Sequence, residues 1–282
     1  MTTDTGVVVR TPRTAILDTR SLGWELVPDL PAAREQILSR GRGRLPAVSV
    51  LWLPESSTVQ ELPGDVFGPG PAWILVLAGD LAIRPRGKGV ATVIRTGHWV
   101  DAAGAGVEID RPYRSQGSLG ALVVRDRFPS TATLDAAVRL SPDVVVVDTL
   151  AMPWSRHFGM EIGRTKVLAT QDDGTPLAYL TRTPAGSTAT EVGKAPARHY
   201  HRTVSERIFV LGGRLVLREW ANMEDQSGTR VLVREGYFID REPGSIHAVE
   251  ERSPVGFASL EIRSGVGNYP NDPNYVAENY IE

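Results

Sequence analysis

Apolar residues in this chain come in short runs that alternate with polar residues and end at Gly, Pro or Asp. Alternation with a period of two, rich in β-branched and aromatic side chains, predicts β-strands. The predicted strands are residues 48–53, 73–83, 90–94, 121–125, 144–147, 177–181, 208–217, 231–233 and 258–262. Evenly spaced strands with polar turns are typical of a small barrel or a double-sheet jelly roll.

Two segments lack this alternation. Residues 31–39 are flanked by Asp29 or Leu30 at the start and Gly41 beyond the end, which predicts a helix. Residues 131–143 show no strand pattern, and we expect a short helical turn around residues 133–140. The expected fold class is all-β with few short helices.

The chain repeats itself at nearly constant spacing. The triplet Leu17-Asp18-Thr19 returns as Val147-Asp148-Thr149, which is 130 residues later (148 − 18). Gly97, at the end of a similar strand, matches Gly236 at a spacing of 139 residues (236 − 97). Because the extra residues enter between predicted strands, a duplicated fold explains the pattern. The expected domains are residues 1–140 and 141–282.

Composition excludes several function classes. The net charge of −2 gives no electrostatic reason to bind nucleic acid or an anionic membrane surface. The absence of cysteine excludes disulfides, thiolate metal sites and cysteine nucleophiles. No apolar run approaches the roughly 18–20 residues that span a bilayer, and the amino-terminal residues lack the layout of a secretory signal. The cytoplasm is therefore the expected location.

The strongest chemical signal is a cluster of imidazoles. The pattern His199-x-His201-x4-Glu206 is followed by Gly244-x2-His247, so three of the five His of the chain fall inside it. His199 and His201 are two residues apart, and on a strand they project from the same face. Imidazole and carboxylate donors without sulfur suit Fe(II), Mn, Ni, Co or Zn, and donor type alone does not choose among these ions. The sequence predicts one divalent transition metal ion at these four residues.

This pattern resembles the two sequence motifs of the cupin superfamily, whose metal ligands are the two His and the Glu of the first motif and the His of the second. All four ligand positions are matched in this chain. The departures concern the flanks, where Glu242 stands in place of a frequent proline and Glu251 in place of a frequent asparagine. The resemblance implies two tandem cupin double-stranded β-helix (jelly-roll) barrels, with the metal held by the matched residues.

A narrower resemblance covers most of residues 147–262, with a fainter copy over residues 17–125. This part is similar to the cupin branch that includes the metal-binding domain of zinc anti-sigma factors and the aromatic-ketone dioxygenases of the 2,4'-dihydroxyacetophenone type. The anti-sigma reading is weakened because those proteins carry a separate Cys-containing zinc domain, and this chain has no Cys.

The first copy of the repeat is expected to have lost its ligands. Alignment of the two copies puts other residue types at the ligand positions. These residues are Asp65, Phe67, Ala72 and Glu108, in the places of His199, His201, Glu206 and His247. Two carboxylates at most are too few for a firm transition-metal site. The domain of residues 1–140 is therefore predicted to be metal-free.

Three further residues allow two interpretations each. Lys166 lies in a strand-like run, where it either points inward as a substrate anchor or takes an ordinary strand position. Trp24 and Trp154 occupy equivalent places in the two copies, and we expect them to pack in a core or an interface rather than to form a stacking platform.

The expected function is that of a metal-dependent cupin enzyme. We expect an Fe(II) oxygenase that binds O2 and a small aromatic or diketone-like substrate. The alternatives are a non-redox isomerase, lyase or decarboxylase that uses Zn, Mn or Ni, and a non-catalytic metal- or ligand-binding protein. A versatile scaffold does not decide among these chemistries. A homodimer is also compatible with the sequence.

Overall fold

The computed structural model describes residues 6–27, 30–40, 46–55, 66–68, 70–87, 89–104, 106–110, 117–132, 135–156, 163–186, 198–251, 254–264 and 275–277. These residues form strands and a single 3-10 helix, η1 (Thr19–Ser21), with no α-helix among them. The expected all-β fold class is confirmed. In this part of the chain, no helix has the length and apolar character needed to cross a membrane.

The chain divides into two compact units whose limits differ from the expected domains. We name Gly23–Met152 the central unit, and Met1–Leu22 together with Pro153–Glu282 the histidine unit. The expected boundary lay between residues 140 and 141, so it assigned the first 22 residues to the other unit. The two observed boundaries are themselves 130 residues apart (152 − 22), which is the spacing of the sequence repeat.

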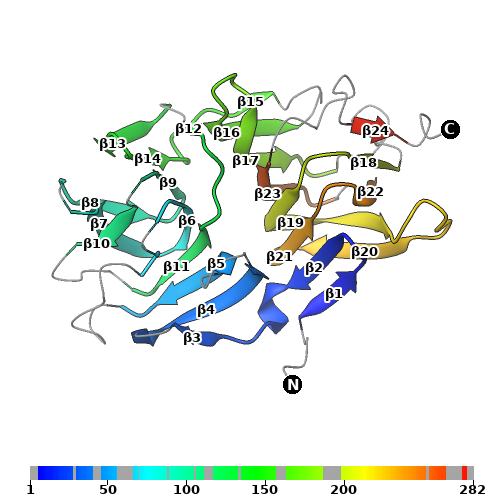
Figure 1. Ribbon diagram of the computed structural model, residues 1–282, viewed down its shortest axis with the longest axis horizontal. Coiled ribbons are helices and arrows are strands. Elements are labelled where there is room, and N and C mark those ends of the chain that lie inside the picture. The colour runs from blue at the N-terminus through cyan, green and yellow to red at the C-terminus, as the bar shows by residue number, and fades with distance from the viewer. Residues whose placement is uncertain are drawn as a thin grey trace. The chain divides into compact units, whose positions relative to one another are not determined.

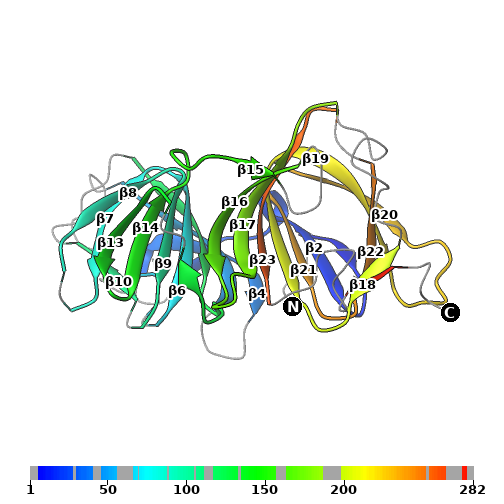
Figure 2. The same cartoon turned by 90° about the horizontal axis from the view of Figure 1, so that it is seen from above.

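The histidine unit is built from antiparallel strands around the long strand β19. Its strands are β1 (Val7–Arg10), β2 (Thr14–Asp18), β15 (Ser155–Arg156), β16 (Arg164–Thr170), β17 (Pro176–Thr183), β18 (His199–His201), β19 (Glu206–Trp220), β20 (Thr229–Arg234), β21 (Tyr237–Arg241), β22 (Ile246–Glu251), β23 (Phe257–Arg263) and β24 (Tyr275–Ala277). Hydrogen-bonded neighbours follow the order β1-β2-β21-β19-β23-β17-β16, and Figure 2 shows β16, β17 and β23 of this order side by side. The far half of β19 pairs with β20 and β22, and β18 lies between β22 and β24.

The central unit repeats this plan, with two strands, β6 and β7, in place of the long strand β19. Its strands are β3 (Glu25–Val27), β4 (Leu30–Arg40), β5 (Pro46–Leu53), β6 (Ala72–Ala78), β7 (Asp80–Pro85), β8 (Thr92–Arg95), β9 (His98–Ala102), β10 (Val107–Ile109), β11 (Leu119–Val124), β12 (Thr131–Ala132), β13 (Ala137–Ser141) and β14 (Val144–Asp148). One sheet has the order β13-β14-β9-β6-β11-β5-β4-β3, and the other has the order β10-β7-β8. Buried apolar side chains such as Phe67, Leu81 and Val123 form its core.

Each sequence repeat begins with a hairpin that pairs with the unit formed by the other copy of the repeat. The hairpin β1-β2 pairs with β21 of the histidine unit (Figure 1), and β13-β14 pairs with β9 of the central unit. The repeated threonines, Thr19 and Thr149, make equivalent hydrogen bonds at the end of each hairpin. Thr19 Oγ1 donates to the carbonyl of Gly236 at 2.6 Å, and Thr149 Oγ1 donates to the carbonyl of Gly97 at 2.5 Å. The repeated triplet thus contains the threonine that bonds each hairpin to its unit.

Both predicted helical segments are wrong. Residues 31–39 lie in β4, which pairs with β3 and β5, although Ala, Arg, Glu, Gln and Leu favour helices. Residues 137–141 form β13 and pair with β14. Backbone pairing with neighbouring strands overrides local propensity here, because propensity differs by only about 1 kcal/mol or less per residue.

Gly213 lies in β19 opposite Phe257, the first residue of β23. Its φ is +74°, and a Cβ built there would lie 2.0 Å from the carbonyl oxygen of Gly256. Gly79, its counterpart in the central unit, has φ +79° and a Cβ position 2.2 Å from the carbonyl oxygen of Ser118. Only glycine allows both the left-handed backbone and this close approach. The alignment of Gly79 with Gly213 is confirmed.

We therefore expect Gly213→Ala to destabilise the protein by about 3 kcal/mol, because a strained backbone and a steric clash act together. The matched control is Gly174→Ala, where φ is +85° but no atom lies within 4 Å of the added Cβ. That substitution should cost only about 1 kcal/mol for the left-handed conformation. Urea denaturation of both variants checks the difference, and equal losses would show that the close approach to β23 is unimportant.

Candidate metal centre

Three histidines converge inside the histidine unit. His199 and His201 lie at the two ends of β18, and His199 is opposite His247 of β22 in the strand register. All three side chains are buried, and one ring nitrogen from each lies within 4.8 Å of the others. The rings of His199 and His247 are the nearest pair, with centroids 4.3 Å apart. The predicted same-face arrangement of His199 and His201 is confirmed.

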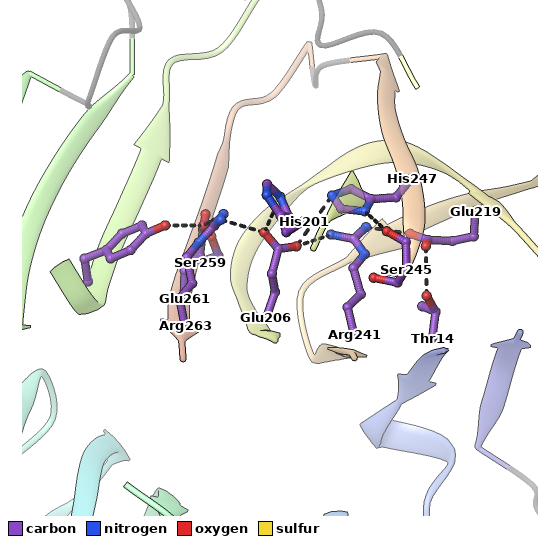
Figure 3. Close-up of polar contacts among 11 residues, drawn as sticks. Thr14, His201, Glu206, Glu219, Arg241, Ser245, His247, Ser259, Glu261 and Arg263 are labelled. Atoms are coloured by element: carbon purple, nitrogen blue, oxygen red, sulfur yellow. Dashed lines mark hydrogen bonds and ion pairs between the residues drawn. The ribbon is translucent and has the colours of Figure 1, made fainter. Parts of the chain in front are cut away.

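Glu206 reaches the same place from the first residue of β19. Its Oε1 lies 3.2 Å from His201 Nε2, and its Oε2 lies 3.5 Å from His247 Nε2 (Figure 3). Two donors that each lie about 2.1 Å from one ion are separated by about 3.0–3.5 Å at coordination angles of roughly 90–115°. The spacing of Glu206 from two imidazoles therefore fits a shared ion. The three-histidine group itself does not include Glu206, so its role as a fourth ligand stays a prediction.

Two buried arginines hold the Glu206 carboxylate. Arg263 Nη1 lies 2.6 Å from Oε1, and Arg241 Nη1 donates to Oε2 at 3.0 Å. Burial alone would raise the pKa of Glu206, but the charge of Arg263 and the adjacent imidazoles outweigh it and hold the pKa well below the ordinary value. Glu206 is therefore a fixed carboxylate anion at neutral pH.

The arginines continue into a ladder of alternating charges. Five side chains form this series, which we call the charge ladder (Figure 3). In order they are Glu219, Arg241, Glu206, Arg263 and Glu261. Arg241 Nη2 donates to Glu219 Oε1 at 2.5 Å, and Arg263 Nη2 donates to Glu261 Oε2 at 3.1 Å. Three carboxylates and two guanidiniums leave one net negative charge when all five are ionised. The ladder therefore favours a cation beside Glu206.

Neutral side chains close both ends of the charge ladder. At one end Thr14 Oγ1 donates to Glu219 Oε2 at 3.2 Å. At the other end the hydroxyls of Tyr179 and Ser259 donate to Glu261, at 3.1 and 3.2 Å. Burial raises the pKa of Glu219, and the ion pair with Arg241 opposes that rise. Every carboxylate in the ladder thus has at least two polar partners.

The backbone fixes the orientation of His247. Its Nδ1 lies 3.1 Å from the carbonyl oxygen of Ser245, which can only accept, so Nδ1 carries the proton and Nε2 is left as a donor to a metal ion. Burial, followed by the charge of Arg241, lowers the pKa of His247 well below its ordinary value. A neutral imidazole is the form that coordinates metal ions.

The four predicted ligands are thus brought together, but the sequence did not reveal their partners. Glu261 and Arg263 flank Ile262 in a largely apolar strand, and a charged residue in such a strand is the signal that could have found these two, because it implies a buried ionic partner. Glu219 and Arg241 stand next to other charged residues, so the sequence offers no such signal for them. Which partner each residue has depends on strand register, which the sequence did not show.

Lys166 and the two repeated tryptophans behave differently from the predicted site residues. Lys166 is opposite Leu180 in the register, while the neighbouring Tyr179 points its hydroxyl into the charge ladder. Successive residues face opposite sides of a sheet, so Lys166 faces away from the ladder and is not an inward anchor. Its ammonium lies 4.5 Å from the centre of the half-buried Trp154 ring. Trp24 is 47% exposed, so it does not pack in a core.

The central unit has apolar side chains at most of the positions that form the ionic site of the histidine unit, although Arg125, at the place of Arg263, pairs with Glu35 at 2.8 Å. The strand registers match Ala72 to Glu206, Ala102 to Arg241 and Val123 to Glu261. All three side chains are buried in the core of the central unit. Phe67, at the place of His201, is buried there as well. Asp65 lies outside the described residues. Among the residues that the structure describes, the only three-donor group that could hold a metal ion is the one in the histidine unit.

One position of the predicted alignment is wrong by a single residue. His247 is opposite Glu219 in the register, and the matching position of Glu219 is Pro85, which is opposite Val107 rather than Glu108. Val107 is buried in the core. A shift of one residue moves a side chain to the other face of a strand. Glu108 accordingly pairs with Arg84 at 2.8 Å, away from that core.

Comparison with known proteins extends these observations. No protein-family model matches the sequence, and no curated protein matches it. Solved structures do match along nearly the whole chain. The protein Ylba from E. coli is 13% identical with a TM-score of 0.56, and the match covers 91% of this chain and 93% of that one. A mutant of Bacillus subtilis oxalate decarboxylase is 11% identical with a TM-score of 0.57, and the match covers 98% and 82%.

A third structure, a protein from Nostoc punctiforme named as a candidate dioxygenase, is 11% identical with a TM-score of 0.61, and the match covers 95% of this chain and 90% of that one. Identities this low speak for the fold alone. The duplicated strand plan and the whole-length likenesses agree with each other. The chain therefore has the cupin fold in its two-barrel form.

Proposed function

We propose that the histidine unit is a metal-dependent oxygenase whose centre consists of His199, His201, His247 and Glu206. The observation that carries this proposal is the convergence of three buried imidazoles beside a buried carboxylate. Nitrogen and oxygen donors without sulfur suit a divalent transition metal ion, and we favour Fe(II). The single net negative charge of the charge ladder supports a cation at this place.

The residues of the chain have separate tasks in this proposal. His247 is held neutral by burial and by the charge of Arg241, and the carbonyl of Ser245 keeps its proton on Nδ1, so Nε2 is available to the ion. Arg241 and Arg263 keep the Glu206 carboxylate from rotating, which pre-organises the site. When bound, Fe(II) supplies the one-electron chemistry that lets O2 react with an organic substrate.

We propose a small substrate of the aromatic-ketone or diketone class, which binds through oxygen atoms. With a divalent ion added, the ladder and the ion together carry one net positive charge, and a single deprotonated oxygen ligand neutralises it. Enolised diketones and phenolic ketones can supply such a ligand. The fold likeness to the Nostoc punctiforme protein named as a candidate dioxygenase supports the same direction.

A non-redox reaction at the same centre is the second candidate. The fold likeness to oxalate decarboxylase, which covers 98% of this chain, favours it together with the charged surroundings of the histidines. A Lewis-acidic ion such as Zn, Mn or Ni beside two guanidiniums suits carbonyl polarisation or decarboxylation. The two candidates share every ligand and differ in their need for O2.

Oxygen consumption distinguishes the two candidates. We expect the purified protein, stripped of metal and reconstituted with Fe(II), to consume O2 with one of a panel of diketones and phenolic ketones. The variant His199→Ala, treated in the same way, should consume none. An oxygen electrode and metal analysis of the same samples provide the readout. One equivalent of zinc in the native protein, with no oxygen consumption after iron reconstitution, would contradict the oxygenase proposal.

A further inference from the structure

We propose that Thr14, supplied by the amino-terminal hairpin, is a positioning residue of the metal centre, acting on Glu206 through Glu219 and Arg241. This inference rests on the proposed metal site and adds to it a residue that lies 185 positions before the first histidine ligand (199 − 14). Thr14 would not touch the ion or the substrate. Its task is to hold the far end of the charge ladder.

Three consecutive contacts connect Thr14 to the ligand carboxylate. Thr14 Oγ1 donates to Glu219 Oε2 at 3.2 Å, Arg241 Nη2 donates to Glu219 Oε1 at 2.5 Å, and Arg241 Nη1 donates to Glu206 Oε2 at 3.0 Å. All four side chains are buried, with exposed fractions from 0% to 3%. Water therefore has little access to replace a lost partner, and each contact restricts the next.

The strand register places Thr14 directly on this path. Thr14 is opposite Arg241 in the pairing of β2 with β21. The preceding residue supports the same region, because Arg13 Nη1 donates to the carbonyl of Pro243 at 2.7 Å and the N–H of Glu242 donates to the carbonyl of Arg13 at 2.8 Å. The turn that follows Arg241 leads into β22, which carries His247. The start of β2 therefore supports Glu206, through Glu219 and Arg241, and also the turn that leads to His247.

The central unit shows what this position looks like without a metal site. Val144 occupies the place of Thr14, because β14 is opposite β9 as β2 is opposite β21, and Val144 is opposite Ala102. The position of Glu219 is Pro85 there. Valine and threonine have nearly the same shape, so packing alone does not require a hydroxyl. The hydroxyl occurs in the copy that has the charge ladder.

Removal of the hydroxyl has a defined physical consequence. Glu219 Oε2 loses its donor in a buried position, and the carboxylate is then free to turn toward Arg241 as its one remaining partner. The Arg241 guanidinium would follow and relax its hold on Glu206. Loss of a residue that orients a metal ligand weakens metal binding by about 10–100-fold. Because Thr14 acts through two intermediate residues, we expect the lower end of that range.

Zn(II) and Co(II), each added alone to the metal-free full-length protein, test the proposal. We expect Thr14→Val to weaken Zn(II) binding by about tenfold in competition with a chelator, and to shift the visible spectrum of bound Co(II). Thr14→Ser restores the hydroxyl and should bind within about twofold of the original protein. The matched control is Thr19→Val, which removes another hydroxyl of the same segment, at Gly236, and should also stay within about twofold.

The outcomes separate this inference from the proposed function. If the original protein binds neither ion, the metal site itself is wrong. If it binds Zn(II) tightly and Thr14→Val binds equally well, only the role of Thr14 is refuted. In a Glu219→Gln background, Thr14→Val should have a clearly smaller effect, and simple additivity would refute the route through Glu219. If Thr14→Val does not fold, Glu219→Gln alone tests the next contact, and unchanged affinity there overturns the proposal.

Discussion

Alanine at His199 or His247 is expected to abolish metal retention. The two residues face each other across β18 and β22, and each offers one of the three converging ring nitrogens. Loss of one ligand should reduce affinity by roughly 100-fold or more, since even an outer partner of a ligand is worth about 10–100-fold. Metal content after dialysis should fall from about one equivalent per chain in the original protein to a small fraction in either variant.

Elemental analysis and circular dichroism together provide the check. His98→Ala is the matched control, because His98 lies in β9 of the central unit, in a different sheet from the predicted ligands. It should keep its metal. Both ligand variants should keep the β-sheet signal of the central unit, which contains none of the four predicted ligands. If metal content survives both ligand substitutions, the ligand assignment is wrong.

The second large effect is expected at Arg241. Arg241→Met should destabilise the metal-free protein by about 3–5 kcal/mol, because it leaves buried carboxylates without their shared cation. Glu206 and Glu219 are 2% and 0% exposed, so water cannot take the place of the guanidinium. A bound metal ion neutralises Glu206, so the loss should be smaller in the metal-loaded protein.

Urea denaturation in the presence and absence of a chelator measures this difference. The matched control is Arg84→Met, which breaks the Arg84–Glu108 pair, where the arginine side chain is 42% exposed. A partly exposed pair contributes about 0–1 kcal/mol, so this variant should remain close to the original. Adding Glu219→Gln to Arg241→Met should recover part of the stability, because it removes one of the stranded charges. Equal losses at Arg84 and Arg241 would mean that the charge ladder contributes little.

The fold class, and the convergence of the four candidate ligands, could be predicted from the sequence. Period-two alternation is a local property, so the predicted strands over residues 48–53 and 208–217 lie within β5 and β19. The spacing of His199 and His201 is also local, and any strand places them on one face. These features depend only on neighbours in the chain, which is why they could be predicted.

The features that sequence reasoning missed depend on distant pairing. Residues 31–39 have helical propensity, but β3 and β5 offer backbone partners that make them a strand. The alignment puts Glu108 one residue out of register, because the segment that follows the aligned glycine is one residue shorter in the central unit (107 − 97 = 10) than in the histidine unit (247 − 236 = 11). The sequence alone does not single out Arg241 and Arg263, because an inward direction on a strand is visible only once its neighbours are known. The repeat predicted two copies, but not that the first hairpin joins the later unit.

That exchange has a consequence for the order of folding during synthesis. The central unit is continuous from Gly23 to Met152, so all of its strands are available once that segment has emerged. The histidine unit is discontinuous, and Thr14 meets Glu219 across a separation of 205 residues. Contacts between such distant residues form slowly, because a long loop must close first. We therefore expect the hairpin β1-β2 to lack its partner β21 while the central unit folds, and the candidate metal centre to assemble late.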